Sequence, residues 1–483
     1  MRKLTILGLY FVLAGICGAE IITVDDDAPA DFNNIQAAID DSNDGDIIEV
    51  RPGIYTGNGN RDIDPNGKAV TIRSIDPNDP NIVAATIIDC NGTEAEPHRG
   101  FYFHNQEDSN SSVEGLTVTN GLANEGGGFY LDDSSPLIAK CIISGNSAKD
   151  RGGGVFNYES SPILINCTFK GNSAAGGGGG MTNFWGSSPT LVNCTFSNNL
   201  VLDIPITGGG GGGMNNIENS NPMLTNCIFS GNSAVGGGGG MSNESSSPSL
   251  LNCIFVGNLA NCGKGIINWW AQAIPTLTNC ILWDGKDGNE ICNMLGATVS
   301  ITYSDVQGGW PGLGNIDTDP CFVEPGYWDA NGTPSDANDD FWVNGDYHLK
   351  SEGWRWVAPE GNWTWDNVTS RCIDAGNPGS PLADELLVIP RDPDNLYGRN
   401  LRINMGTYGG TTEASMPPYD WAILADLTND GKVDFNDLTE QVEDWLNSSS
   451  EQPGDLDRNG IIDMVDFALL GKDWLTQTTW HEP

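Results

Sequence analysis

Two acidic stretches near the C-terminus carry oxygen-bearing side chains at the spacing that binding of a hard metal ion requires. They read DLTNDGKVDFNDL, from Asp426 to Leu438, and DLDRNGIIDMVDF, from Asp455 to Phe467. Both follow the pattern D-x-x-x-[DN]-G-x-x-D-x-x-D, and the second copy begins 29 residues after the first. A chance match of two such patterns is improbable, so we interpret both as metal-binding loops.

Calcium takes six or more oxygen ligands, and a twelve-residue loop supplies them from positions 1, 3, 5, 7, 9 and 12. Glycine at position 6 allows the sharp turn that such a loop needs. The sequence therefore predicts two calcium ions, one in each loop. The expected ligands are Asp426, Thr428, Asp430, the Lys432 carbonyl, Asp434 and Asp437 in the first loop, and Asp455, Asp457, Asn459, the Ile461 carbonyl, Asp463 and Asp466 in the second.

Each loop leads into an amphipathic helix, but no helix enters either loop, and position 12 is Asp instead of the Glu of an EF-hand. These features make residues 419–483 resemble a type I dockerin. The resemblance implies calcium-dependent folding and a cohesin partner, usually in polysaccharide-degrading assemblies. Its recognition positions, 10 and 11 of each loop, often hold Ser or Thr, whereas this chain has Phe435, Asn436, Met464 and Val465 there. A calcium-stabilised module with a different surface partner is the alternative.

The middle of the chain is an internal repeat of about 26 residues. One copy is PILINCTFKGN, from Pro162 to Asn172, and its cysteine recurs as Cys141, Cys167, Cys194, Cys227, Cys253 and Cys280, at intervals of 26, 27, 33, 26 and 27 residues. Apolar and polar residues alternate within each copy, which is typical of a strand. We expect two or three strands per copy, stacked as the coils of a parallel β-helix. The runs of five or six glycines then form coil corners instead of a linker.

Stacking predicts columns of like residues, because strands of neighbouring coils lie ~4.8 Å apart. The cysteines should form one column, with Phe169, Phe196, Phe229 and Phe255 on the same inward face. The preceding asparagines should form a second column of hydrogen-bonded amides, namely Asn166, Asn193, Asn226, Asn252 and Asn279. Parallel Cβ vectors in a column favour free, buried thiols over disulfides. Pairing among Cys262, Cys292, Cys321 and Cys372 is left open.

The repeats, with F-x-x-N followed by glycines, resemble those of polymorphic outer-membrane proteins. The segment Asn33 to Asn58 resembles the opening of pectate-lyase-like β-helices, which implies that FNNIQAAIDD forms a capping helix. We therefore expect an all-β, right-handed parallel β-helix solenoid with a small α-helical calcium-binding domain. The predicted divisions are a signal peptide at 1–19, the β-helix at 20–315, a loop-rich cap at 316–418 that ends in a strand near RINMGTY, and the dockerin-like module at 419–483.

Composition limits the partners. The 22 Lys and Arg residues against 64 Asp and Glu residues give a net charge of −42, which argues against nucleic acid and against anionic membrane surfaces. The N-terminus has Arg2 and Lys3, then an apolar run to Ile16 and small residues before Ala19, which is typical of a secretory signal. Acylation of Cys17 is a weaker alternative. We expect an exported protein with no membrane span.

Residues for catalysis are sparse in the repeats. Arg151 is the sole arginine between Cys141 and Pro311, and the loop acids there are Asp203, Asp284 and Asp287. Lyases on such a fold need a base, usually Arg, together with calcium, and hydrolases need clustered carboxylates. The repeats show neither arrangement, so no catalytic constellation emerges. Tryptophan faces near the turns suit sugar stacking, or they pack over coil corners: Trp185, Trp269, Trp270, Trp283 and Trp310.

The leading hypothesis is a secreted β-helix protein that binds extracellular carbohydrate or a partner along its flank and docks to an extracellular assembly through its calcium module. One alternative is a polysaccharide lyase or glycoside hydrolase, and another is a surface adhesin. Whether the protein is catalytic, and whether it is attached to a cell surface, the sequence leaves open.

Overall fold

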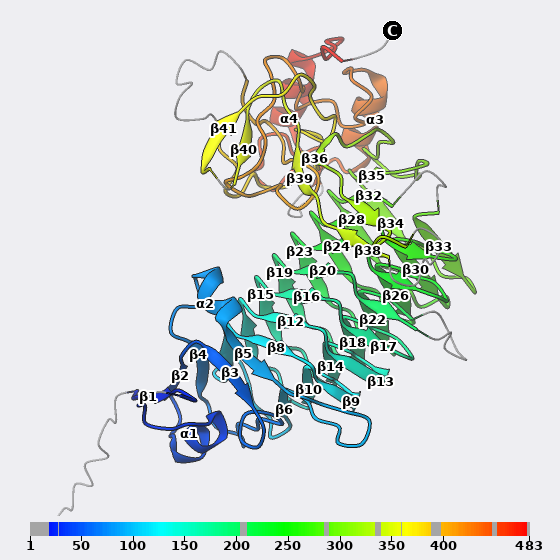
Figure 1. The fold of residues 1–483 in the computed structure, drawn as a ribbon. Coiled ribbons are helices and arrows are strands. Elements are labelled where there is room, and N and C mark those ends of the chain that lie inside the picture. Colours follow the sequence, from blue (N-terminus) through cyan, green and yellow to red (C-terminus); the bar gives the residue numbers. More distant parts are fainter. Residues whose placement is uncertain are drawn as a thin grey trace, which may run out of the picture.

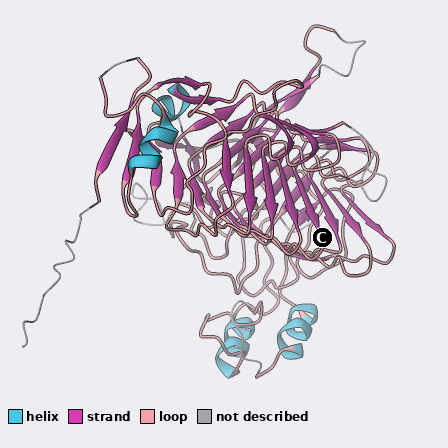
Figure 2. Cartoon of the chain, turned by 90° about the horizontal axis from the view of Figure 1, so that it is seen from below, coloured by secondary structure: helices cyan, strands magenta, loops and turns pink. Residues whose placement is uncertain are grey.

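The computed structural model describes residues 19–27, 29–202, 210–284, 289–333, 340–358, 360–387, 398–446 and 452–480. Residues 1–18 of the expected signal segment, including Cys17, lie outside these residues, as do Asp203 and Asp287. Figure 1 shows a long stack of parallel strands that carries a smaller C-terminal region at one end. Figure 2 shows the helices outside this stack.

Four parallel sheets build the stack, and each coil contributes one strand to each sheet in its central part. The 11-stranded sheet contains β1 (Ile21–Val24), β2 (Ile47–Val50), β4 (Thr71–Ser74), β7 (Ser112–Glu114), β11 (Leu137–Ala139), β15 (Ile163–Ile165), β19 (Thr190–Val192), β23 (Met223–Thr225), β27 (Ser249–Leu251), β31 (Thr276–Thr278) and β34 (Ser300–Thr302). The 10-stranded sheet contains β3 (Gly53–Thr56), β5 (Thr86–Asp89), β8 (Thr117–Thr119), β12 (Ile142–Ser144), β16 (Thr168–Lys170), β20 (Thr195–Ser197), β24 (Ile228–Ser230), β28 (Ile254–Val256), β32 (Ile281–Trp283) and β35 (Asp305–Val306).

The other two sheets complete each coil. The 8-stranded sheet contains β6 (Phe101–Phe103), β10 (Phe129–Asp132), β14 (Val155–Tyr158), β18 (Met181–Phe184), β22 (Met214–Ile217), β26 (Met241–Glu244), β30 (Ile266–Trp269) and β33 (Ile291–Met294). The 6-stranded sheet contains β9 (Leu122–Glu125), β13 (Ser147–Arg151), β17 (Ser173–Ala174), β21 (Leu200–Val201), β25 (Ser233–Ala234) and β29 (Leu259–Ala260). The stacked solenoid is therefore confirmed, with four short strands per central coil instead of the two or three expected.

A short helix closes the N-terminal end, as the sequence predicts. The helix α1 (Ile35–Asp41) begins after Asn34, whose side chain accepts a hydrogen bond from the Ala37 N–H. Its Ile35, Ala38 and Ile39 are buried against the first coil. A second helix, α2 (Pro80–Ala85), lies outside the stack, and its N-cap residue is Asp79.

Glycines stand where consecutive coils approach too closely for a side chain. A Cβ added to Gly180 would lie 2.6 Å from the Gly213 carbonyl oxygen, and one added to Gly154 would lie 2.5 Å from the Gly180 carbonyl oxygen. Real Cβ atoms do not approach backbone so closely. Gly178 and Gly238 have φ of +63° and +71°, which L side chains rarely adopt. The glycine runs are therefore coil corners.

The inward columns also stand as predicted. The column cysteines are buried and free, and the Cys141 and Cys167 thiols donate to carbonyls of the preceding coil. The four phenylalanines stack with ring centroids 4.3, 4.8 and 4.7 Å apart and nearly parallel planes. This core runs along the whole solenoid. Outside the column, Cys262 and Cys292 form a disulfide, whereas Cys321 and Cys372 are free.

The predicted amide ladder is wrong in its residues, because other asparagines form it. The asparagines before the cysteines have φ near +55°, because they form the tight turn between two strands of each coil, and within the described chain they make no ladder. Hydrogen-bonded amides run instead along two other columns: Asn146, Asn172, Asn199, Asn232 and Asn258, and Asn157, Asn183, Asn216, Asn243, Asn268 and Asn293. These side chains are buried inside the coil corners, except that of Asn293, which is exposed at the end of its column. The turn asparagines are not uniformly buried.

Three antiparallel strand pairs occupy the region after the last coil. They are β36 (Phe322–Glu324) with β39 (Asp346–Leu349), β37 (Tyr327–Asp329) with β38 (Phe341–Val343), and β40 (Arg355–Val357) with β41 (Asn362–Thr364). The strand expected near RINMGTY is wrong, because this segment has no strand partner. It packs instead on the solenoid, where Thr407 donates to the Cys227 carbonyl and the Gly406 N–H donates to the Asn279 carbonyl.

Candidate functional site

The second acidic loop brings its carboxylates together. Asp455, Asp457 and Asp466 each offer an oxygen within 4.8 Å of the others. Backbone N–H groups aim the two buried ones, since Asp455 accepts from Asn459 and Gly460, and Asp466 accepts from Asp457 and Asp463. Three converging carboxylates on a rigid loop are the donor set that calcium prefers. The residues of this loop therefore fit the predicted ion.

The first loop has the same hydrogen bonds from backbone N–H groups to its carboxylates, but it differs from the second loop at position 3. Asp426 accepts from the Asp430 and Gly431 N–H groups, and Asp437 accepts from Thr428 and Asp434. The Thr428 hydroxyl also donates to Asp437, at 3.1 Å. Thus the hydroxyl at position 3 is engaged with the carboxylate at position 12.

Lys432 changes the charge of the first loop. Its ammonium lies 2.8 Å from an Asp434 carboxylate oxygen and 3.6 Å from one of Asp430. This contact raises the pKa of Lys432 and lowers that of Asp434. A cation already lies beside two of the expected ligands, so the first loop fits calcium less well than the second.

A helix follows each loop and begins within it. The helices are α3 (Phe435–Glu443) and α4 (Met464–Lys472), and both start with a capping box, Asp434 with Asp437 and Asp463 with Asp466. The residues at positions 9 and 12 therefore fix the helix start as well as offering ligand oxygens. Phe435, Met464 and Val465 are 72%, 64% and 51% exposed, and Asn436 is exposed too. The predicted recognition residues are thus accessible at the start of each helix.

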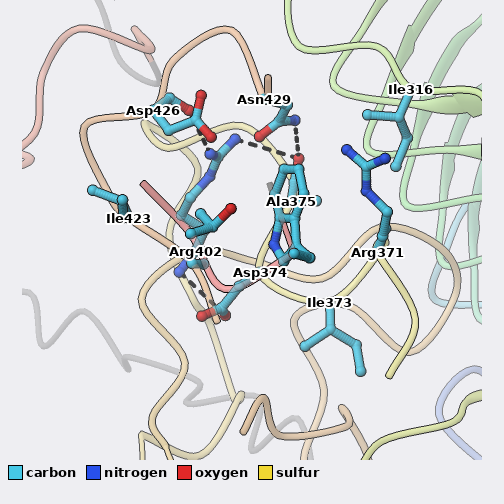
Figure 3. A pocket seen from close by; sticks show the side chains of 12 residues that line it. Ile316, Arg371, Ile373, Asp374, Ala375, Arg402, Ile423, Asp426 and Asn429 are labelled. Atoms are coloured by element: carbon cyan, nitrogen blue, oxygen red, sulfur yellow. Dashed lines mark hydrogen bonds between the residues drawn. The ribbon is translucent and has the colours of Figure 1, made fainter. Parts of the chain in front are cut away.

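The opposite side of the loop pair packs on the end of the solenoid (Figure 3). Arg402 is fully buried there and donates to the carbonyls of Gly376 and Asp426. The Asn429 amide donates to the carbonyls of Gly314 and Ala375, at 2.7 and 2.8 Å. The space left between these groups is about 10 Å³, room for one water molecule at most. This contact is a packed interface, not a ligand site.

A second candidate site lies on the outer face of the 8-stranded sheet. Rings of successive coils meet there: Tyr102 stacks on Tyr130 with centroids 5.3 Å apart, and Tyr130 meets Phe156 edge-on at the same distance. The series continues through Phe184 and ends at Trp185, which is 50% exposed. An aromatic strip thus follows the solenoid axis over several coils. Phe156 in its middle is buried, so the exposed parts of the strip lie toward its two ends.

A hollow of about 370 Å³ opens at the start of this strip, lined by Asp62, Pro97, His98, Arg99, Tyr102, Ala123, Asn124 and Tyr130. The Arg99 guanidinium lies 5.2 and 4.8 Å from the ring centroids of Tyr102 and Tyr130. Burial lowers the pKa of Arg99. Asp62 holds the neighbouring imidazole of His98, with Oδ2 2.6 Å from Nδ1. We call Asp62, His98, Arg99, Tyr102 and Tyr130 the arginine cradle.

The cradle combines groups that bind polar rings. Its guanidinium carries five N–H donors in a fixed fork, which suit hydroxyl or carboxylate oxygens. Its tyrosines offer apolar ring surface with a polar edge. The sequence analysis does not include the cradle, because its residues come from separate segments, around positions 62, 98 and 130, that only the stacking of coils brings together. The strand pattern FYF beside His98-Arg99, followed by FYL one coil later, is the signal that would have found it.

The tryptophans expected near turns divide into two groups. Trp185 and Trp270 are exposed, at 50% and 43%, and Trp269 ends a strand of the 8-stranded sheet. Trp283 and Trp310 pack instead against buried clusters. Only the first group therefore belongs to the surface that the aromatic strip follows.

The acids considered for catalysis stay apart from the cradle. Asp284 is buried at the end of an asparagine column, where its Oδ1 accepts two hydrogen bonds from Asn258. Arg151 lies over the Phe184 ring, at 5.1 Å, as part of the aromatic strip. Asp284 thus satisfies buried hydrogen-bond donors, and Arg151 packs on the Phe184 ring. Within the described residues the two form no catalytic pair.

These features define a parallel β-helix protein with an acidic C-terminal pair of loops. A family model described as "Right handed beta helix region" matches residues 50–201 and 99–302. Together the matches cover more than half of the 483 residues, so the chain belongs to this family.

The solved structures that the chain matches include two lyases and an esterase. The pectate lyase Pel9A is 14% identical, with 81% of this chain and 97% of that chain covered and a TM-score of 0.40. A rhamnogalacturonan lyase is 11% identical, with 68% and 96% covered and a TM-score of 0.36. A pectin methylesterase from carrot is 12% identical, with 58% and 87% covered and a TM-score of 0.33. Such scores carry no argument about activity.

No curated protein matches the sequence significantly. None of the helices among the described residues is both long enough and apolar enough to cross a bilayer.

Proposed function

We propose that this protein is secreted and binds an extracellular polysaccharide at the arginine cradle, on the outer face of its 8-stranded sheet. The arginine cradle is the observation that carries the proposal. It places a guanidinium beside two stacked tyrosine rings and a hollow of about 370 Å³, at the start of the aromatic strip. The solenoid supplies what such a ligand needs, which is a long, rigid and regularly spaced surface.

The test is binding of the full chain to a panel of soluble polysaccharides, both neutral and uronate-containing, by affinity electrophoresis. Arg99→Ala should weaken binding of the retained polysaccharide about tenfold or more, because one charge-assisted contact contributes roughly 1.5–3 kcal/mol. Arg61→Ala is the matched control, since this neighbouring arginine donates to the Cys90 carbonyl and lies outside the cradle. Equal retention of the wild type and of Arg99→Ala would contradict the proposal.

The same panel separates binding from catalysis. A polysaccharide lyase would release unsaturated uronates, and a hydrolase would release reducing ends. Sustained turnover that Arg99→Ala abolishes would replace the binding function with an enzymatic one. Retention without turnover supports binding alone, and binding to cells without binding to the glycans would favour the adhesin.

We further propose that residues 419–483 form a dockerin-like module that binds two calcium ions and attaches the chain to a cohesin-like partner. The converging carboxylates of the second loop support the ion, and the exposed Phe435, Asn436, Met464 and Val465 support the docking face. Apolar side chains exposed together are typical of interaction surfaces.

Calcium titration of the full chain by calorimetry tests this module. We expect two ions, with the second loop tighter than the first. Asp457→Ala should weaken the tight site at least tenfold, because it removes one of three converging carboxylates. Thr428→Ala, at the matching position of the first loop, should leave the tight site unchanged. A chain that binds no calcium at millimolar concentration would refute the module.

A further inference from the structure

A tryptophan-bearing hairpin projects from the C-terminal region, apart from both proposed sites. The strands β40 and β41 pair antiparallel, with Trp356 opposite Trp363. Extending this register by one residue places Trp354 opposite Trp365, and the rings of these two residues are in contact. Positions two apart on a strand share a face, so all four tryptophans stand on one face of the hairpin. Figure 1 shows these strands at the outer edge of the region.

Ring geometry confirms this arrangement. Trp356 and Trp363 meet edge-to-face with centroids 5.4 Å apart, and Trp354 and Trp365 do so at 5.3 Å. The two pairs are separated by two residues along the strand, which is roughly 7 Å. The face is therefore a short two-step aromatic surface with a fixed spacing.

The other face holds the hairpin in place. Arg355 donates to both carboxylate oxygens of Asp366, at 3.0 and 3.3 Å. Backbone hydrogen bonds between Trp354 and Met416 tie the first strand to the rest of the region. A bidentate ion pair and a backbone bridge give a rigid mount, so the tryptophans are preorganised.

The tryptophan face is accessible. Trp365 is 65% exposed and the other three are partly exposed. None of the four belongs to a buried cluster of the described residues, although the chain buries aromatic rings elsewhere. Edge-to-face pairing stabilises the hairpin, and it leaves most of the Trp365 side chain exposed to a ligand.

The chemistry of the face selects its ligand. The face of an aromatic ring is electron-rich, so it attracts polarised C–H bonds such as those of a flat pyranose ring. The exposed Glu352 and Glu360, near these strands in sequence, disfavour polyanions at this face, and the net charge of −42 disfavours nucleic acid and anionic lipid surfaces. Hydroxyl groups at the edge of a sugar can meet polar groups of the exposed turn between the two strands, where Glu360 lies. A neutral, extended glycan satisfies all three conditions.

We propose that this face is a second carbohydrate-binding site, which takes a neutral glycan chain of pyranose rings with equatorial substituents. The two tryptophan pairs contact successive sugar rings of one chain. The site is separate from the arginine cradle, and its function does not depend on that proposal. It would hold the protein on a neutral polysaccharide while the solenoid flank stays free.

Binding of cellohexaose to the full chain, followed by tryptophan fluorescence and calorimetry, tests the site. Trp365→Ala should lower the affinity at least tenfold, and Trp356→Ala should do the same. Tyr327→Ala is the matched control, an aromatic residue that is 58% exposed on another two-stranded hairpin, and it should bind like the wild type. Maltohexaose, whose chain is bent, should bind more weakly than cellohexaose.

Further arms separate this site from the cradle and from a purely structural role. Arg99→Ala should leave cellohexaose binding unchanged, so loss in that variant would assign the ligand to the cradle and overturn the hairpin site. Trp365→Phe keeps an aromatic face and should retain most of the affinity. If Trp365→Ala lowers the melting temperature but binds cellohexaose like the wild type, or if the wild type does not bind at millimolar concentration, the face only stabilises the hairpin and the proposal fails.

Discussion

Buried polar residues of this chain stand in columns, and one column ends in a pair of acids. The amide of Asn258 donates to Asp284, and the Asp284 N–H donates to Glu290, whose side chain is also buried. Burial, together with the charge of Asp284, raises the pKa of Glu290 well above its ordinary value of 4.5. The last coil therefore holds a carboxyl group that is protonated at neutral pH.

This pair makes a pH-dependent contribution to stability. Because the folded-state pKa of Glu290 is raised, its contribution is complete below about pH 4.5 and is lost as pH rises through the raised value. From neutral to alkaline pH, the free energy of unfolding should fall by up to about 1.4 kcal/mol per pH unit from this group. Glu290→Gln should flatten that slope, measured by urea unfolding between pH 6 and 9. Glu159 is exposed, so Glu159→Gln should leave the pH dependence of the unfolding free energy unchanged. The same pH dependence in both variants would contradict this prediction.

Among the structural elements, the coil corners depend most strictly on residue type. Five glycines, one per coil, stack so closely that each would place a Cβ against the next backbone: Gly128, Gly154, Gly180, Gly213 and Gly240. The same corners hold the asparagine columns, whose amides satisfy backbone groups that the turn leaves unpaired. The glycines therefore allow the tight bend, and the asparagine amides supply hydrogen-bond partners to backbone groups that would otherwise be buried without one.

Two alanine substitutions test the corners. Gly180→Ala places a Cβ 2.6 Å from the Gly213 carbonyl oxygen and 2.8 Å from the Phe196 ring, so we expect a loss of about 3 kcal/mol in the free energy of unfolding. Gly171→Ala has no atom within 4 Å and meets only the strain of φ +64°, which costs about 1–2 kcal/mol. Chemical denaturation measures both. If Gly171→Ala were the more damaging variant, crowding would not be the reason for the glycines.

The whole molecule is closed at its C-terminal end by the loop pair. Tyr303, which directly follows the last strand of the 11-stranded sheet, donates to the Leu427 carbonyl, and Asn429 reaches Gly314 and Ala375. Residues of the first acidic loop thus contact the solenoid directly. A ligand that binds these loops only when they are folded should therefore stabilise the end of the solenoid.

Calcium should therefore protect the solenoid end. At a concentration 100 times the dissociation constant, calcium adds about 2.7 kcal/mol of stability. Hydrogen exchange at Gly314 and Ala375 should slow when calcium replaces a chelator. Asn429→Gly keeps the left-handed φ of +57° but removes both side-chain hydrogen bonds, so it should bind calcium yet lose this protection. Asn331→Gly, at a remote left-handed turn, serves as the control. Equal protection in both variants would show that the loops and the solenoid are independent.

The sequence by itself determined the repeat. Copies of about 26 residues must stack, because each alone cannot bury its apolar face, and stacking superposes the cysteines and the phenylalanines. The capping helix and both loop-to-helix starts also follow from short-range patterns, since caps depend on neighbours within four residues. The carboxylates of the second loop converge for the same local reason.

Only the tertiary structure decided which asparagines pair. The asparagine before each cysteine occupies a left-handed turn, and a face assignment by strand alternation fails where the backbone bends. The arginine cradle gathers residues from 62 to 130, and the Asn429 contacts join residues 115 and 54 positions apart. Sequence spacing cannot express such contacts, because they depend on how whole coils and the C-terminal region lie in space.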